Sequence, residues 1–475
     1  MNTLAPSRSI PFALLSVMLI DSLAMAIISE QLYWIILPFS VLLFMMGWKS
    51  GRFIFFLLLF SIPFSFEYNF TPDLGTDIPD EGLMLMASLI FVGYWLYNPS
   101  SVDRKTWLHP IIILLLIHFC WIALTTVLSS NPVLSLKYLL AKSWYLGAFV
   151  LAPIVVFKNR GAVIISSLIR ALSVLAVAII ALIRHSQYSF DFAAINQSVA
   201  PFFRNHVNYS AMLVCMVPVF LAFYYLSKNK RIKFFLLIGI LILLTALLFS
   251  YARGAWVALG TGVFAWWLIR KRLVITAFLA TLFLVSVALS WLIEKDRYLR
   301  FAHDFETTVF HQDFKQHLVA TYELKDVSTA ERFYRWIAGI RMTRDSWLHG
   351  FGPNTFYEKY KPYTIPAYKT WVSDNKERSG VHNYFLLLVI EQGIPGLFFF
   401  LLLIGCMLYY AQYLYHNVSD PFYKTVALTT GVIIVMLSTL NFLSDLVETD
   451  KVGSIFFLCL SLLVRATQAP PKSPS

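Results

Sequence analysis

The stretch that decides the fold is His382-Asn-Tyr-Phe-Leu-Leu-Leu-Val-Ile-Glu-Gln-Gly-Ile-Pro-Gly396. It lies where the one long polar segment of the chain meets the next apolar block. Gly393, Pro395 and Gly396 are expected to stop or bend a helix, because glycine tolerates left-handed backbone and proline lacks an amide donor. We therefore predict a short helix that begins at His382 and is separated by this turn from the span that follows.

On both sides of this stretch the chain is strongly apolar. Hydrophobic residues make up 58% of the 475 positions, aromatic residues 16% and charged residues only 13%, and the mean hydropathy is +0.68. Apolar blocks long enough to cross a bilayer, which needs about 20 residues, recur along the chain from Ile10 to Ile28 onward. That first block has no small-residue cleavage site after it, so it is expected to be a retained helix. We predict an all-α polytopic membrane protein with about 12–14 transmembrane helices and a large helical external loop.

The basic residues of the short loops predict the orientation. Outside 294–381 there are 24 Lys and Arg residues, of which 17 lie at the termini or in alternate connections, six on the opposite side, and Arg170 inside a span. Because the basic side of a membrane protein faces the cytoplasm, both termini are expected inside and the long segment outside. The acidic loop Glu67 to Glu81, with five acids and no base, is then external as well.

Two classes of function are not supported by the composition. The net charge of +12 is spread between apolar blocks instead of forming one basic face, so a nucleic-acid partner is not expected. The four cysteines lie in or beside apolar blocks without Cys-x-x-Cys spacing, which predicts neither a disulfide framework nor a zinc site.

The chain divides into five parts at these composition changes. We predict N-terminal transmembrane helices in 1–203, central transmembrane helices with an Arg253 turn in 204–293, an external lid ending in the His-Asn motif in 294–396, C-terminal transmembrane helices in 397–467, and a cytoplasmic tail in 468–475. The segment 294–381 carries 14 basic and 12 acidic residues, which favours a folded lid over a charged tail.

The lid contains one clear helix signal. Ser328 and Glu331 have the spacing of a capping box, and the helix that they begin is expected to run to about Trp347, before Gly350-Phe351-Gly352-Pro353. Three- and four-residue spacing places Arg332, Arg335 and Trp336 on one face.

Arginine forks bind phosphates in a bidentate manner, and three arginines are candidates for this role. Arg332 and Arg335 would present such forks from the lid helix, although a solvated face paired with Glu331 explains them too. Arg253, in Ser250-Tyr-Ala-Arg-Gly-Ala-Trp256, occupies a tight turn on the external side. It is either a side chain that reaches the headgroups or part of a ligand site.

His382 is the candidate base. Its ordinary pKa near 6.5 suits proton transfer from a sugar hydroxyl at neutral pH, and Asn383 could orient it or the substrate. A structural histidine at an apolar boundary is the alternative. Arg204 and Asn208, at the external start of a span, could bind sugar hydroxyls, or the Asn residues there could cap a helix.

These motifs together resemble the O-antigen ligase and O-antigen polymerase superfamily. The resemblance rests on His382-Asn383 followed by Gly393 and Gly396, on the Arg253 turn, in which Tyr251 and Ala252 stand between the usual Ser and Arg, and on Arg332-x-x-x-Trp336 with the later Gly350-x-Gly352-x-x-x-Phe356 turn. It covers about Arg204 to Tyr415.

The resemblance implies an enzyme of the bacterial inner membrane that acts in lipopolysaccharide biosynthesis. It would transfer a polyprenyl-pyrophosphate-linked glycan to an acceptor hydroxyl at the periplasmic face, without a metal or other cofactor. Arg253 and Arg332 would hold the pyrophosphate, His382 would act as the base, and Arg335, Asn383, Arg204 and Asn208 would contact substrate. The partners implied are the lipid-linked donor, a lipid A-core or glycan acceptor and membrane lipids.

Several readings stay open. The first is ligation of O-antigen to lipid A-core, followed by polymerisation of a surface polysaccharide and then by protein O-glycosylation. A transporter of lipid-linked glycan is a different class, but no internal repeat is visible and the cations gather at one face. A metal-dependent transferase would need carboxylates such as Asp73, Asp77, Asp80 and Glu81, for which a solvated acidic loop is the alternative.

Overall fold

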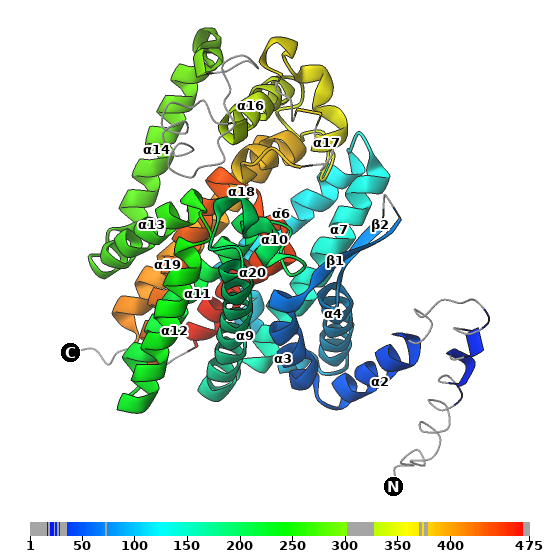
Figure 1. The fold of residues 1–475 in the computed structure, drawn as a ribbon, viewed down its shortest axis with the longest axis vertical. Helices are drawn as coiled ribbons and strands as arrows, with labels where there is room; N and C mark the ends of the chain where they lie inside the picture. The colour runs from blue at the N-terminus through cyan, green and yellow to red at the C-terminus, as the bar shows by residue number, and fades with distance from the viewer. Residues whose placement is uncertain are drawn as a thin grey trace, which may run out of the picture.

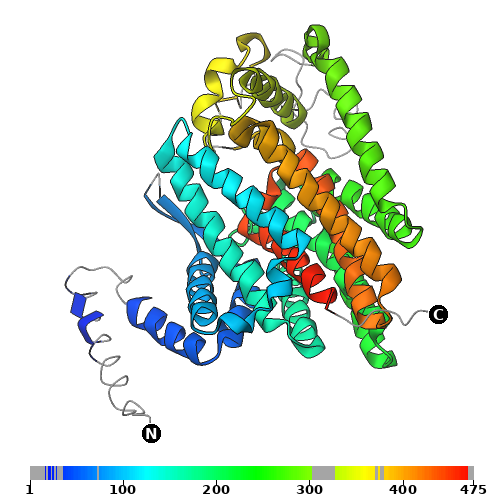
Figure 2. The ribbon, with the colours of Figure 1, turned by 180° about the vertical axis from the view of Figure 1, so that it is seen from behind.

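The computed structural model describes residues 17, 20–22, 24–25, 28, 36–71, 74–301, 327–369, 373–374 and 379–468. In these residues the chain is helical apart from one β-hairpin, as Figures 1 and 2 show. The longer helices are α2 Ile36–Lys49, α3 Gly51–Ser61, α4 Asp80–Tyr97, α6 Pro110–Val127, α7 Pro132–Leu146, α9 Arg160–Ser186, α11 His206–Leu226, α12 Lys230–Leu248, α13 Arg253–Arg270, α14 Val274–Ile293, α16 Val327–Asp345, α18 Tyr384–Asn417, α19 Pro421–Leu443 and α20 Asp450–Ala466.

Eight helices of the described part are long and apolar enough to cross a membrane. The protein is therefore an all-α polytopic membrane protein, as predicted. The other expected spans that are described form shorter or less apolar helices, among them α2, α3, α13 and α20. One span, Pro132–Val156, begins with several polar residues at Pro132, where Asn131 caps the first turn. Most of the first expected block, Ile10 to Ile28, lies outside the described residues.

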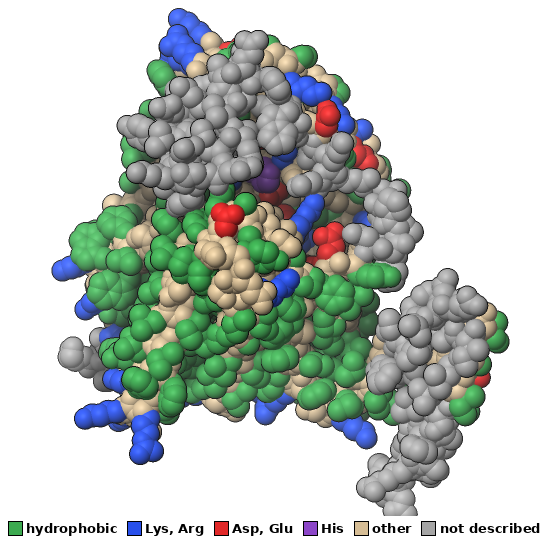
Figure 3. Space-filling view, in the orientation of Figure 1, with side chains coloured by type: hydrophobic (Ala, Val, Ile, Leu, Met, Phe, Trp, Pro, Cys, Tyr) green, Lys and Arg blue, Asp and Glu red, His purple; other side chains and the backbone are tan. Residues whose placement is uncertain are grey.

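The bundle is organised around α19. This helix packs against α11, α13, α18 and α20, and its buried face carries apolar side chains such as Ile434 and Leu437. Figure 3 shows a wide hydrophobic band across the visible face of the body, with Lys and Arg side chains along the edge opposite the lid. This band is the surface expected to face lipid, because apolar side chains can remain exposed only to hydrocarbon at this density.

Helix α18 is two helices joined at Gly393. The helical residues run over Tyr384–Asn417, but Gly393 has φ 72° and ψ −179°, which no α-helix allows. Figure 2 shows the short first part turned away from the long orange part that enters the bundle. The predicted break is thus confirmed, and it leaves a span of ordinary length after Gly393.

The lid lies above this break. It contains α16, the short helix α17 Phe356–Lys359, and the 3₁₀ turn Glu294–Phe301 that follows α14. An ion pair of 2.6 Å between Arg344 and Asp296 joins α16 to that turn. Helix α16 begins at Val327, one residue before the expected cap Ser328, and ends at Asp345.

The acidic segment after α3 differs from the solvated loop that the sequence favoured. Its residues form an antiparallel hairpin, β1 Phe66–Thr71 and β2 Leu74–Ile78, which leads directly into α4. Asp80, the first residue of α4, is fully buried. The alternation of acids and apolar residues in this segment is therefore a strand signal that charge alone obscured.

Candidate active site

Three motifs from distant parts of the sequence meet at the C-terminal end of α19. The first turn of α13 lies against this end, because a Cβ at Gly254 would be 3.2 Å from Cδ1 of Leu443. The ring of Trp336, on α16, lies 6.4 Å from the ring of Phe442. The amide of Tyr384, which begins α18, donates to the carbonyl oxygen of Ser444 at 3.1 Å. The Arg253 turn, the lid helix and the His-Asn motif therefore share one support.

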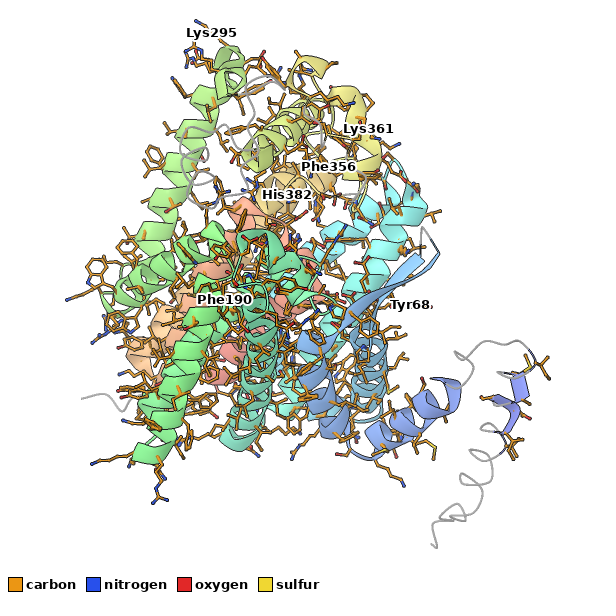
Figure 4. All side chains as sticks on the ribbon, viewed as in Figure 1. Tyr68, Phe190, Lys295, Phe356, Lys361 and His382 are labelled. Atoms are coloured by element: carbon orange, nitrogen blue, oxygen red, sulfur yellow. The ribbon has the colours of Figure 1, made fainter. Side chains whose placement is uncertain are left out.

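His382 is held in place by the backbone on both of its sides. Nε1 of Trp336 donates to the carbonyl oxygen of Val381 at 3.0 Å, and Nη1 of Arg335 donates to that of Gly380 at 3.1 Å. His382 itself has φ 55°, a left-handed backbone that is uncommon for a histidine. Figure 4 places His382 below α16, where the lid meets the bundle. Such a conformation persists only where the surroundings enforce it, which is typical of functional residues.

The imidazole of His382 is electrically neutral at physiological pH. Burial and, to a smaller extent, the positive charges of Arg335 and Arg332 together lower its pKa to about 3. A charged imidazolium would lose hydration and face two guanidinium groups, so both effects disfavour it. His382 is thus in the form that can accept a proton, although in the unliganded chain it is a weak base.

The guanidinium of Arg335 forms its contacts within the lid. It is buried, and besides Gly380 its guanidinium pairs with Glu331 one helical turn earlier, at 3.4 Å. Ser373 donates its hydroxyl to the same carboxylate. The pairing with Glu331 is as the alternative reading expected, but both side chains are buried and do not form a solvated face. The arginine that was predicted to bind substrate therefore has structural contacts.

Arg332 and Arg253 are half-buried and lie on different elements. Arg332 is close enough to His382 to act on its pKa. Arg253 is the first residue of α13, after a turn in which Tyr251 has φ 55°. The amides of a first helical turn and the positive end of the helix dipole favour an anion there. Ser250 is fully buried and donates to the carbonyl oxygen of Leu247 at 2.7 Å, which fixes the turn.

The remaining predicted contacts lie at helix starts. Asn383 is the N-cap of α18, and its Oδ1 accepts from the amide of Leu386 at 3.0 Å. Asn205 caps α11 by accepting from the amide of Asn208 at 3.0 Å, so the capping alternative holds for Asn205. Arg204 is exposed and lies near the hairpin, where it is one of the charges that act on the pKa of Asp77, which burial raises.

The Gly-x-Gly turn of the lid is bonded to the break in α18. Phe351 and Gly352 donate their amides to the carbonyl oxygens of Ile390 and Glu391 at 2.9 and 3.0 Å. In the other direction, Ile394 donates to the carbonyl oxygen of Trp347 at 2.8 Å. The backbones approach so closely that a side chain at Gly393 would overlap the Leu348 carbonyl. The two glycine motifs are therefore bonded to each other and together form the joint between the lid and α18.

Glu391 strengthens this joint and was not assigned a role from the sequence. Its carboxylate accepts from the amides of Asn354 and Phe356 at 2.8 and 3.1 Å, so it binds the turn that precedes α17. The signal in the sequence was the isolated acid in an apolar helix, which requires partners when buried.

Asp445 is the site residue that sequence reasoning missed. It follows α19, its carboxylate lies against Gly380, and burial raises the pKa of that carboxyl while the charge of Arg335 lowers it. Asp445 therefore places an acid at the point where the Arg253 turn, the lid helix and the His-Asn motif meet. The signal for it was a polar Ser444-Asp445 pair at the external end of an apolar span.

Comparison with known proteins agrees with this geometry. Residues 238–401 match the O-antigen ligase family. The matched range contains the Arg253 turn, α16 and the His-Asn motif up to the first turns after Gly393. A search of curated proteins gives no match. The family transfers glycans from lipid carriers to acceptors, so this multi-pass membrane protein is an enzyme. Residues 238–401 therefore carry an O-antigen ligase domain, which supports the predicted resemblance to the O-antigen ligase and O-antigen polymerase superfamily.

Proposed function

We propose that the protein transfers a polyprenyl-pyrophosphate-linked glycan to the hydroxyl of lipid A-core at the periplasmic face of the inner membrane. The observation that carries the proposal is the meeting of Arg253, Arg332 and His382 around the end of α19. Two cationic forks and a neutral base suit a reaction in which a hydroxyl loses a proton and an anion leaves.

In this mechanism Arg332 and the first turn of α13, with Arg253, bind the pyrophosphate of the donor. The acceptor oxygen forms a bond to the anomeric carbon of the donor sugar as the bond from that carbon to the phosphate oxygen breaks. His382 takes the hydroxyl proton, and the polyprenyl pyrophosphate leaves with one more negative charge than it had as an ester. The arginines stabilise that charge where it develops.

Arg335 and Asn383 have supporting roles in the proposal. Arg335 positions Gly380, and through it the backbone of His382, as its contacts with Gly380 and Glu331 indicate. Asn383 uses its oxygen to cap α18, which leaves its amide nitrogen to face an acceptor. Arg204 and Asn208, next to the capped start of α11, would contact the outer sugars of the donor.

The proposal is tested in a strain that lacks the native gene, with lipopolysaccharide analysed on gels. His382→Ala and Arg253→Lys, at wild-type expression, should abolish long-chain decoration, because alanine is no base and a lysine cannot reproduce the guanidinium fork. His416→Ala is the control: this histidine contacts the Ile269 carbonyl at the far end of α18. Full decoration by His382→Ala would remove its catalytic role.

The glycans of the deletion strain separate the ligase from the polymerase. A ligase deletion leaves finished long chains on the lipid carrier, and this result is expected. A lipid A-core that carries one repeat unit would instead identify a polymerase. Normal lipopolysaccharide together with unmodified glycoproteins would point to protein O-glycosylation.

Metal independence is tested in the same assay with purified, reconstituted protein. Chelation before the start of the reaction is expected to leave the initial rate unchanged, because arginine forks supply the charge stabilisation. A rate that falls on chelation while the protein remains folded, and that returns with one divalent ion, would contradict it.

A further inference from the structure

Three carboxylates from distant segments meet beside the β-hairpin, away from the arginine motifs. They belong to Asp77 in β2, Asp80 at the start of α4 and Asp450 at the start of α20. One oxygen of each lies within 4.8 Å of the other two. Of the acids that the sequence brought together as a possible metal site, Asp73 lies outside the described residues, and Glu81 accepts from the hydroxyl of Thr76. Asp450 is distant in the sequence and comes close to Asp77 and Asp80 only in the folded protein.

The buried oxygens of this cluster need a partner. The exposed fraction of Asp80 is 0%. Its Oδ1 accepts from the amide of Glu81 at 3.0 Å, but its Oδ2 has no hydrogen-bond partner among the residues that the structure describes. The same holds for the buried Oδ2 of Asp450, whose other oxygen accepts from the Tyr145 hydroxyl. A buried carboxylate oxygen without a donor or a cation is costly and rare.

The neighbouring cationic side chains are bound elsewhere. Lys451 donates from Nζ to the carbonyl oxygens of Ile62 and Ser65 at 3.0 and 2.9 Å. Arg170, buried on α9, donates from Nη2 to the Lys451 carbonyl oxygen and to the Ser454 hydroxyl, both at 2.8 Å. Within the described part of the chain, no Lys or Arg forms an ion pair with any of the three aspartates. Lys451 therefore acts on all three carboxyl groups through space, but it forms no ion pair with any of them.

We propose that Asp77, Asp80 and Asp450 bind one divalent cation, with Ca²⁺ as the ion that fits best. Carboxylate oxygens are the hard ligands that Ca²⁺ and Mg²⁺ take. Oxygens bound to one Ca²⁺ at about 2.3–2.6 Å can lie up to roughly 5 Å apart, whereas Mg²⁺ at about 2.0–2.1 Å requires a tighter group. The present spacing accepts Ca²⁺ without rearrangement.

The role of this cation is structural. It would join the hairpin and α4, from the N-terminal half, to α20 near the C-terminus. It takes no part in the proposed transfer, which relies on arginines and a histidine. On the external side of the membrane a site of this kind can have a Kd on the order of 10⁻⁴–10⁻³ M and still be filled.

The test uses the full chain, purified in detergent and freed of metal with a chelator. Ca²⁺ is titrated by calorimetry and by the midpoint of thermal unfolding. Wild type should bind one Ca²⁺ per chain and unfold at a higher temperature with it, and Mg²⁺ should bind more weakly. Asp80→Asn and Asp450→Asn should each weaken Ca²⁺ binding at least tenfold. Asp374→Asn, an exposed aspartate on the lid, should bind as wild type does.

Two results would overturn the proposal: wild type that binds no Ca²⁺ at millimolar concentration, and asparagine variants that bind it as tightly as wild type. The variants are expected to fold, since each removes a repulsive charge from the cluster. If either fails to fold, terbium emission excited through tyrosine is measured on wild type. Emission that Ca²⁺ displaces supports the site, because Tyr145 touches Asp450, and a lack of emission overturns it.

Discussion

The neutral state of His382 can be measured directly. Its pKa is lowered from 6.5 to about 3, first by burial and then by Arg335 and Arg332. This difference corresponds to on the order of 5 kcal/mol against the imidazolium form. At pH 5.5 His382 should remain fully neutral, whereas a histidine with a pKa of about 6.5 would be only about one-tenth neutral.

Diethyl pyrocarbonate modifies neutral imidazole and distinguishes these cases. The purified protein is treated briefly at pH 7.5 and at pH 5.5, with N-acetylhistidine in the same tube as the standard, and the peptide that contains His382 is followed by mass spectrometry. The rate for His382 should change less than twofold between the two pH values. The rate for the standard should fall about tenfold.

A parallel tenfold fall for His382 would refute the reasoning, because it would mean an ordinary pKa despite burial and two neighbouring cations. Arg332→Gln separates the causes. Removal of this charge should raise the pKa of His382, while burial and Arg335 still keep it below 6.5. If Arg332→Gln left the low-pH reactivity of His382 unchanged down to pH 3, the arginine would not be acting on the imidazole.

Four further outcomes are expected. Wild type should lose stability as the pH falls from 6.5 towards 3, because in that range the unfolded chain binds a proton at His382 that the folded chain does not; His382→Gln should flatten this loss in thermal unfolding. Gly393→Ala places a side chain against the Leu348 carbonyl at φ 72° and should cost at least about 1–3 kcal/mol, read as a lower unfolding midpoint. Glu391→Gln puts an amide donor where two backbone amides need acceptors, which should cost about 1–3 kcal/mol in the same assay. Trp336→Phe removes the donor to the Val381 carbonyl and should lower transfer more than it lowers stability, as a kcat measurement on reconstituted protein would show.

The helical membrane fold was readable from the sequence because apolar blocks and polar connections alternate so clearly. The helix starts were less readable. The helix that begins at Pro132 has polar residues in its first turns, and its start is marked by the Asn131-Pro132 cap and not by apolar composition. The hairpin before α4 was missed because its five acids suggested a solvated loop. Asp80 is buried next to Asp450 of α20, and this contact between distant parts of the sequence cannot be read from the local composition.

The individual residues of the candidate site could be predicted from the sequence, but the way in which they come together could not. His382, Arg253 and Arg332 follow from motif and residue chemistry, and the break at Gly393 follows from glycine and proline. Their meeting at Phe442–Asp445 does not, since it depends on the packing of α19 against α13 and α18 and on the contact between the rings of Phe442 and Trp336. Sequence reasoning also treated Arg335 as a second phosphate ligand. Only the structure shows that the guanidinium of Arg335 is bound to Glu331 and to the Gly380 carbonyl oxygen.

A base with a pKa near 3 is too weak to remove a hydroxyl proton unaided. In the proposed mechanism the charge of the leaving group would raise the basicity of His382. Arg332, one of the two arginines whose charge lowers the pKa of His382, is also expected to bind the pyrophosphate. As the pyrophosphate gains negative charge on leaving, it would offset the field of Arg332 at His382, so the imidazole would accept the proton more easily when the bond to phosphate breaks. Without a donor, the histidine stays neutral and exchanges no proton with solvent near neutral pH. In the proposed mechanism, proton transfer to His382 would therefore depend on the presence of the leaving group.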